Sequence, residues 1–398
     1  MHSSATNLGE YSMKIYLLAT SSLMISGSLA LAGGYELQTL DTSAMYEDGS
    51  FVSLSYASIN SNLKGKDAGG IKVKTLKDQT LTNLAFKTQV GDFSLGMTTY
   101  RSGAIQMNGS SDSTFTGVQM SGNYIPSANA ELNTTTFLAK YNINESFSVL
   151  GGVKSNQLNS FNLTSIYGSY DIASKSNSNY VVGSAYQVPD IALRAEILVQ
   201  PASTISTTGT YTSSLVALSS VGLTDIPAGF TGAVAATLKT PEMITLNFQS
   251  GVAADTLLTA SIHQAKWKSA QVNVGVTTSS PVSSASIDTA AAVSSDFSDS
   301  TKYSIGLARK FSKTISGSIS YSQEDGSGST STSTFSMSNG SQSINAGFRY
   351  GFEVFDLSVG VSQTMFKDVT VDVNALTSPI EYKNNTATTV GIKLSTNF

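Results

Sequence analysis

The final segment of the chain, TATTVGIKLSTNF at 386–398, alternates between apolar and polar side chains. Val390, Ile392 and Leu394 occupy one parity, whereas Lys393 lies on the other. Successive side chains of a β-strand point to opposite faces of the sheet, so a period of two gives the strand one apolar and one polar face. The apolar face needs an apolar environment, whereas the lysine needs water. The segment therefore predicts a β-strand that separates an apolar medium from an aqueous one.

The composition is unusual for a water-soluble protein of 398 residues. Charged residues make up only 13%, against about 25% in average soluble domains, and mean hydropathy is close to zero at +0.02. Beyond residue 32, no stretch approaches the ~20 continuous apolar residues of a membrane-spanning helix. A transmembrane β-barrel combines these properties, because lipid-facing and lumen-facing residues alternate along each strand. The net charge of −4 argues against a nucleic-acid surface, so no nucleic-acid partner is expected.

The one long apolar run lies near the N-terminus, where 13–32 reads MKIYLLATSSLMISGSLALA. A lysine, an apolar core and the small-residue sequence Ala-Leu-Ala at 30–32 follow the order of a secretory signal peptide. We predict that 1–32 is a leader, that Met13 is the true start, and that cleavage follows Ala32. An uncleaved anchor helix is the alternative. The chain has no cysteine, which excludes disulfides and thiolate metal sites.

Segments of suitable length and alternation recur along the rest of the chain. Most have about the ~9–11 residues that cross a membrane at the usual tilt, and their number is even, as a single-chain bacterial barrel requires. We therefore expect an all-β fold: a 14-stranded antiparallel transmembrane β-barrel over 51–398, with a short N-terminal plug segment, or hatch, over 33–50. The predicted strands are 51–60, 82–90, 93–101, 134–142, 147–156, 178–188, 190–201, 241–251, 254–267, 301–310, 314–323, 342–351, 354–366 and 386–398.

Very short and very long connections alternate between these strands. The short ones, such as Gly91-Asp92 and Pro189-Asp190, carry residues that tolerate or pre-set the backbone angles of tight turns. The long ones are rich in Ser, Thr, Gly and Asn, and such an asymmetry is typical of outer-membrane barrels with periplasmic turns and external loops. Both termini are then expected on the periplasmic side. The long connections are 61–81, 102–133, 157–177, 202–240, 268–300, 324–341 and 367–385.

Blocks along nearly the whole chain resemble the FadL family of outer-membrane transporters for long-chain fatty acids and other hydrophobic compounds. The family's strand number agrees with the fourteen predicted strands, although the segment before the first strand is shorter than in the family and lacks its Asn-Pro-Ala motif. The blocks are GGYELQTLDTSAMYEDGSFVSLSYASIN at 33–60, FLAKYNINESFSVLGGV at 137–153, YVVGSAYQVPDIALRAEI at 180–197, PEMITLNFQSGVAADTLLTASIHQAKW at 241–267 and YSIGLARKFSKTISGSISYSQE at 303–324.

The resemblance implies a barrel in the outer membrane of a Gram-negative bacterium, plugged from the periplasmic side by its own hatch. It implies passive uptake of a hydrophobic small molecule such as a fatty acid, caught at the external loops and released sideways into the membrane. Outer-membrane lipids are then the other expected partner. Burial of a long acyl chain gains ~0.8 kcal/mol per methylene, so an apolar pocket could extract it from the cell surface.

Arg194 and Glu196 lie two positions apart in the predicted strand 190–201, on the parity opposite Ile197 and Val199. A charge on the lipid face near mid-membrane costs ~2–4 kcal/mol, so both charges should point into the lumen. There they could bind a ligand carboxylate, or they could form a structural ion pair.

A few large apolar residues in the polar loops are the other candidates for ligand contact. The alternative is that they pack against one another within their loops. These candidates are Phe115, Ile125 and Leu132 in 102–133, and Leu218 and Phe230 in 202–240.

The sequence carries no recognisable catalytic set, metal motif or cofactor motif, so we expect a protein that is not an enzyme and needs no cofactor. His263 is the one histidine after the leader, and a hydrogen-bonded wall residue is its expected role. Two other functions remain open. The polar loops and short hatch would suit a general diffusion porin for small polar solutes, and the Ser/Thr-rich loops would suit a surface adhesin.

Overall fold

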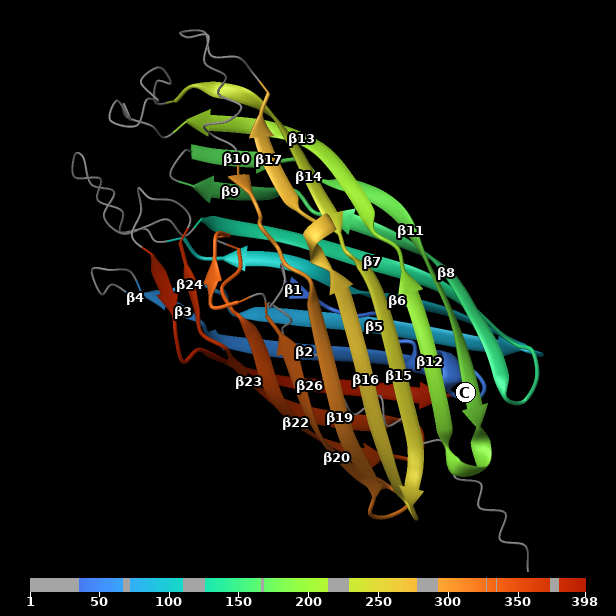
Figure 1. Cartoon of the computed structure of the whole chain (residues 1–398). Coiled ribbons are helices and arrows are strands. Elements are labelled where there is room, and N and C mark those ends of the chain that lie inside the picture. Colours follow the sequence, from blue (N-terminus) through green and yellow to red (C-terminus); the bar gives the residue numbers. More distant parts are fainter. Residues whose placement is uncertain are drawn as a thin grey trace, which may run out of the picture.

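The computed structural model describes residues 36–66, 72–109, 126–165, 168–213, 229–277, 293–326, 328–333, 335–372 and 379–398. Long antiparallel strands dominate this part of the chain and wrap into a tilted barrel (Figure 1). The predicted leader, with Met13 and Ala32, lies outside the described residues. No helix among the described residues is long and apolar enough to cross a membrane.

Fourteen of the described strands close into a single antiparallel ring, as predicted. Around the ring the order follows the chain, and β26 completes it by pairing with both β23 and β2. In order, the strands are β2 (Phe51–Asn62), β5 (Gln79–Val90), β6 (Phe93–Met107), β7 (Ser127–Asn142), β8 (Phe147–Leu158), β11 (Lys175–Val188), β12 (Leu193–Gln200), β15 (Glu242–Ala253), β16 (Thr256–Lys266), β19 (Ser300–Lys310), β20 (Ile315–Asp325), β22 (Gly340–Gly351), β23 (Asp356–Phe366) and β26 (Thr386–Asn397).

The alternation in β26 appears in the structure as two faces. Val390, Ile392 and Leu394 are 55%, 46% and 43% exposed on the outside of the barrel, whereas Lys393 is 9% exposed on the inside. The same contrast recurs in β12, where Ile197 is exposed outside. An outer wall of exposed apolar side chains requires lipid around it. The chain is a membrane-spanning barrel, and this architecture places it in the outer membrane of a Gram-negative bacterium.

Aromatic side chains ring the outside of the barrel near its short turns. Phe93 lies 4.7 Å from Tyr141 between ring centroids, and Phe147 lies 4.9 Å from Tyr186. All four side chains are at least 40% exposed. Aromatic girdles of this kind mark the interface between hydrocarbon and water. The short-turn end, which also carries the C-terminus (Figure 1), therefore lies at the periplasmic interface.

Much of the opposite end, where long polar loops were predicted, consists of further β-strands. Segments rich in Thr and Val extend the sheet beyond the membrane, because β-branched side chains favour extended backbone. Two of these strands, β13 and β14, pair with each other over ten residue pairs. The added strands are β9 (Phe161–Ser165), β10 (Gly168–Ile172), β13 (Ser203–Ser213), β14 (Thr231–Thr240), β17 (Val272–Val276) and β18 (Val293–Ser294), with a separate small sheet of β3 (Lys64–Lys66), β4 (Lys72–Lys74), β21 (Thr330–Ser331), β24 (Val369–Val371) and β25 (Ile380–Tyr382).

Residues 36–50 lie inside the barrel, and we call them the luminal segment. The segment begins with β1 (Glu36–Leu37), which pairs with β6, and continues into the short 3-10 turn η2 (Ser43–Tyr46). Met45 and Leu40 pack there against Leu138 of β7 and other inward-facing apolar residues. A larger apolar cluster fills the outer end of the interior, where Tyr170, Tyr211, Trp267, Phe297 and Phe335 are all buried.

Replacement of Ile392 by lysine would place a charge in the middle of the outer apolar face of β26. We expect Ile392→Lys to destabilise the folded barrel in lipid by about 2–4 kcal/mol. Thr386→Lys, on the same face but at the outer end of the strand, should cost only about 0–1 kcal/mol. Urea titration of both variants in lipid vesicles measures the difference, and equal costs would contradict the assignment of Ile392 to hydrocarbon.

Candidate functional site

Glu196 of β12 anchors the luminal segment to the barrel wall. Its carboxylate accepts hydrogen bonds from Thr42 Oγ1 at 2.8 Å and from the Tyr46 hydroxyl at 2.5 Å. Asn247 of β15 donates a further bond at 2.8 Å from the neighbouring wall strand. Burial of a carboxylate is costly unless hydrogen-bond donors surround it, and here three donors do. Glu196 therefore links two points of the segment to two strands of the wall.

Tyr46 also lies beneath two cations of the wall. The Lys140 Nζ is 4.4 Å from the centroid of the Tyr46 ring, and the Arg194 guanidinium carbon is 4.1 Å from it. Both contacts fall in the range of cation–π attraction. Burial, together with the Glu196 carboxylate, raises the pKa of the Tyr46 hydroxyl, so this group remains a hydrogen-bond donor. Arg194 and Glu196 thus both contact Tyr46 of the luminal segment.

The end of the luminal segment is held by Lys87 of β5. Its Nζ donates to the backbone carbonyls of Glu47 and Gly49, each at 2.7 Å. Burial raises the pKa of the Glu47 side chain from 4.5 to about 7, although the positive charges of Lys393 and Arg349 act in the opposite direction. Docking of the segment therefore favours the protonated form of Glu47.

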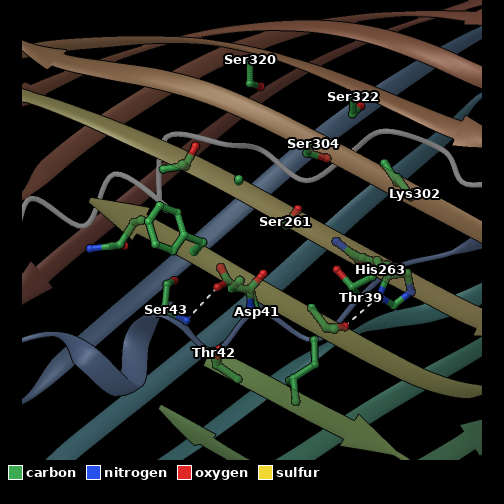
Figure 2. Close-up of a pocket in the computed structure, with 18 of the residues that line it drawn as sticks. Thr39, Asp41, Thr42, Ser43, Ser261, His263, Lys302, Ser304, Ser320 and Ser322 are labelled. Atoms are coloured by element: carbon green, nitrogen blue, oxygen red, sulfur yellow. Dashed lines mark hydrogen bonds between the residues drawn. The ribbon is translucent and has the colours of Figure 1, made fainter. Parts of the chain in front are cut away.

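A polar cavity of about 220 Å³ lies between the luminal segment and the wall. Figure 2 shows Thr39, Asp41 and Ser43 of the segment at this cavity, with wall residues from neighbouring strands around it. Many of the wall side chains are hydroxyls and amides, so the cavity offers hydrogen-bonding groups, while Leu37, Leu40, Phe248 and Ala260 add apolar surface. The polar wall side chains include Thr245, Asn247, Gln249, Ser261, His263, Lys302, Ser304, Ser320, Ser322 and Asn345.

His263 is the most distinctive group in this polar cavity. Its Nδ1 shares a hydrogen bond of 2.8 Å with Thr245 Oγ1, while its buried Nε2 has no hydrogen-bond partner among the described residues. In the strand register, Thr245, His263, Lys302 and Glu324 stand side by side across four wall strands. This row supplies hydrogen-bonding and charged groups at one level of the lumen. The described residues bring no three His, Asp or Glu side chains together to hold a metal ion.

A second, smaller cavity of about 30 Å³ lies in the outer end of the barrel. Its lining is apolar and comes from β6, β7, β8 and the added strands, with Phe335 contributed by the segment between β21 and β22. The interior therefore has an apolar cavity toward the outside of the cell, and a cavity with many hydrogen-bonding groups next to the luminal segment. The main apolar lining residues are Ile105, Leu158, Phe161, Leu163, Leu238, Val272, Val274 and Phe335.

The structure places the predicted ligand-contact residues of the loops in different environments. Leu132 is not in a loop, because the alternating sequence SANAELN extends β7 back to Ser127, and its side chain is buried beside Leu158 and Ile205. Phe230, just before β14, is partly buried against the large apolar cluster. Phe115, Ile125 and Leu218 lie outside the described residues. Contact of any of these residues with a ligand stays a prediction.

Arg194 and Glu196 do point into the lumen, with 9% and 4% exposure. Among the described residues, however, Glu196 bonds to the luminal segment and Asn247 rather than to Arg194. Sequence reasoning missed Tyr46, which connects the two, and it also missed Lys87. Lys87 is the one charged residue of β5 and lies at lumen parity, the same signal that identified Arg194. Nothing local marked Tyr46, since its partner lies 150 positions away.

The closed ring, the apolar belt and the occupied lumen define a transmembrane barrel with an internal N-terminal segment. The structure is similar to that of a FadL homologue from Pseudomonas aeruginosa, with a TM-score of 0.69 and 13% identity, over 92% of this chain and 96% of that one. It is also similar to the Pseudomonas putida toluene transporter TodX, with a TM-score of 0.62 and 14% identity over 89% and 91% of the two chains.

The Ralstonia pickettii toluene transporter TbuX gives a TM-score of 0.62 at 14% identity, over 92% of this chain and 97% of that one. No protein-family model and no curated protein matches the sequence. At these identities the likeness shows the fold: the chain has the architecture of FadL-type transporters. The resemblance seen in the sequence is confirmed at that level.

Removal of the Tyr46 hydroxyl tests how firmly the luminal segment is held. Tyr46→Phe keeps the ring under the two cations but removes one hydrogen bond to a buried carboxylate, a loss of about 1.5–3 kcal/mol. Hydrogen exchange of the amides at 43–47 should accelerate by about 10–100-fold. Tyr180→Phe, on the exposed outer wall, is the matched control and should leave these amides unchanged. Unaltered exchange in Tyr46→Phe would show that Glu196 does not anchor the segment through this bond.

Glu47 should make the docking of the segment depend on pH. Because its pKa is raised from 4.5 to about 7, its contribution to docking is fully present below about pH 4.5 and is lost as the pH rises through about 7. After correction for intrinsic rates, exchange at 43–47 should be faster at pH 8 than at pH 5. Glu47→Gln should abolish this difference, and an unchanged pH dependence in that variant would assign it to another group.

Proposed function

We propose that the protein takes up hydrophobic compounds across the outer membrane by passive passage through its barrel, with the luminal segment as the plug. The observation that carries the proposal is the contrast between an outer cavity lined by apolar side chains, around Phe335, and a cavity beside the plug that also carries many hydrogen-bonding groups. Transfer of an apolar compound from water at the cell surface into the outer part of the lumen is favourable. The gain in free energy is ~25 cal/mol per Å² of apolar surface buried. The toluene transporters TodX and TbuX, which share the fold, support the same class of cargo.

Long-chain fatty acids are the cargo we favour within this class. A fatty acid has a long apolar tail and one carboxylate, and the two parts of the lumen offer both environments. The apolar residues at the outer end suit the tail. His263 and Lys302, which are among the residues that line the polar cavity, suit the carboxylate because charge-assisted hydrogen bonds are the stronger ones. Monoaromatic hydrocarbons are the alternative cargo, and they would use only the apolar part.

Uptake by cells that lack the native gene and carry a plasmid copy tests the apolar entry. Phe335→Asp puts a carboxylate into the apolar cavity, so uptake of radiolabelled oleate should fall at least about tenfold, in line with the cost of an unpaired buried charge. Val354→Asp, at an exposed turn position on the periplasmic end, is the matched control and should transport normally. Normal oleate uptake by Phe335→Asp would exclude this route.

The same assay separates fatty acids from aromatic compounds. His263→Leu removes a hydrogen-bonding group from the polar cavity, so oleate uptake should fall several-fold while toluene uptake stays within twofold of the wild type. Equal effects on both compounds would reject carboxylate recognition by His263. Wild-type uptake of toluene without any uptake of oleate would restrict the cargo to hydrocarbons.

A general diffusion porin is the second candidate, and one observation favours it. The inner faces of β19, β20, β22 and β23 carry many serines, such as Ser320, Ser343 and Ser358, and their hydroxyls make this side of the lumen polar. Planar-bilayer recordings distinguish the two functions. A large, steady conductance of the wild type would support the porin, whereas a closed wild type that conducts in Tyr46→Ala would support the plugged transporter.

A further inference from the structure

Four lysines share one face of the small outer sheet. Lys64 and Lys66 lie on β3, and Lys72 and Lys74 lie on the neighbouring β4. The register sets Lys64 opposite Lys74 and Lys66 opposite Lys72. Side chains that stand directly opposite in an antiparallel pair project from the same face of the sheet. We call this group the lysine face.

The lysine face points outward from the barrel wall, because β3 continues the alternation of β2. On the outward parity of β2, Leu54 and Tyr56 are 50% and 46% exposed within the apolar belt. The next outward positions are polar, and the alternate, inward residues Ile59 and Leu63 are fully buried. The outward series after Tyr56 is Ser58, Asn60, Asn62, Lys64 and Lys66.

The same series gives the height of the lysine face above the membrane. A strand rises ~3.3 Å per residue, so Lys64 lies about 26 Å along the chain from Tyr56. With the usual barrel tilt of ~40°, this corresponds to roughly 20 Å along the membrane normal. The small sheet lies at the end of the barrel opposite the C-terminus (Figure 1), which is the cell-surface end. The lysines therefore stand beyond the hydrocarbon, beside the sugars of the outer leaflet.

The arrangement carries unbalanced positive charge. Like charges that stand directly opposite on two strands destabilise the pairing, and here two such pairs are neighbours. Asp78 forms an ion pair with Lys74 at 2.8 Å, and Glu381 of β25 forms one with Lys383 at 2.9 Å. Glu381 also stands opposite Lys66 in the register. Among the ion pairs between described residues, none involves Lys64, Lys66 or Lys72.

We propose that the lysine face binds the phosphate groups of lipopolysaccharide molecules that surround the barrel. A phosphate between facing lysines would neutralise both charges and remove the cross-strand repulsion. Lipopolysaccharide carries phosphates on its sugars outside the hydrocarbon, at the height of these lysines, whereas the phosphates of ordinary phospholipids lie closer to the edge of the apolar belt. The proposal requires the barrel to be in the outer membrane and is independent of its cargo.

Binding of purified lipopolysaccharide to the detergent-solubilised barrel tests the proposal. A triple variant, Lys64→Gln with Lys66→Gln and Lys72→Gln, should bind a phosphorylated rough lipopolysaccharide roughly 100-fold more weakly, at about fivefold per lysine. Lys175→Gln with Lys268→Gln and Lys313→Gln removes three exposed lysines elsewhere and should change affinity less than threefold. Without lipopolysaccharide, the triple variant should melt at or above the wild-type temperature, because repulsion has been removed.

Three results would overturn the proposal. The triple variant could bind as tightly as the wild type, or enzymatically dephosphorylated lipopolysaccharide could bind as tightly as the phosphorylated form. Inorganic polyphosphate could also bind with the same affinity and the same dependence on the three lysines, which would indicate a general polyanion surface rather than a lipid site. If the triple variant does not fold, Lys72→Gln alone should still weaken binding about fivefold, and an unchanged affinity in this single variant would reject the site.

Discussion

The backbone pairing between β26 and β2 is the interaction on which the rest of the molecule depends. It runs from the partners Phe51 and Asn397 to Asn62 and Thr386, and it converts a curved sheet into a ring. Inside hydrocarbon no water can form hydrogen bonds with a free backbone N–H or C=O. The first and last strands of a membrane-spanning sheet therefore have to pair with each other. Once the ring is closed, each strand must turn apolar side chains outward. The remaining parity then faces an enclosed lumen, and the contents of that lumen decide what can pass.

The lumen is organised by a few charged side chains that the closed ring brings together. Glu196, Lys140 and Arg194 come from two wall strands and meet at Tyr46 of the luminal segment. A charged group is costly in this setting unless it has partners, and here the segment supplies them. The segment is thus held by polar contacts on its wall side, while Met45 adds apolar packing. An attachment of this kind is specific in position but consists of few bonds.

Much of the barrel could be predicted from the sequence, because each strand carries its own alternation. The last strand was expected at 386–398 and ends at Asn397 in the structure. The strand expected at 190–201 begins only at Leu193, since Pro189 and Asp190 start a 3-10 turn. The outer strands were missed because segments such as STISTTGTYTS have the composition of a loop, and only their pairing with distant strands reveals them as sheet. The contacts of Tyr46 could not be predicted for a similar reason, because they join residues that are far apart in the sequence.

The outer hairpin of β13 and β14 has a consequence for how such a protein can change over time. Although this hairpin lies between β12 and β15 in the chain, those two strands pair directly with each other. The ring would therefore stay complete whatever the length of the insertion. The sequence and length of this projection can therefore diverge while the spanning wall below it keeps its register.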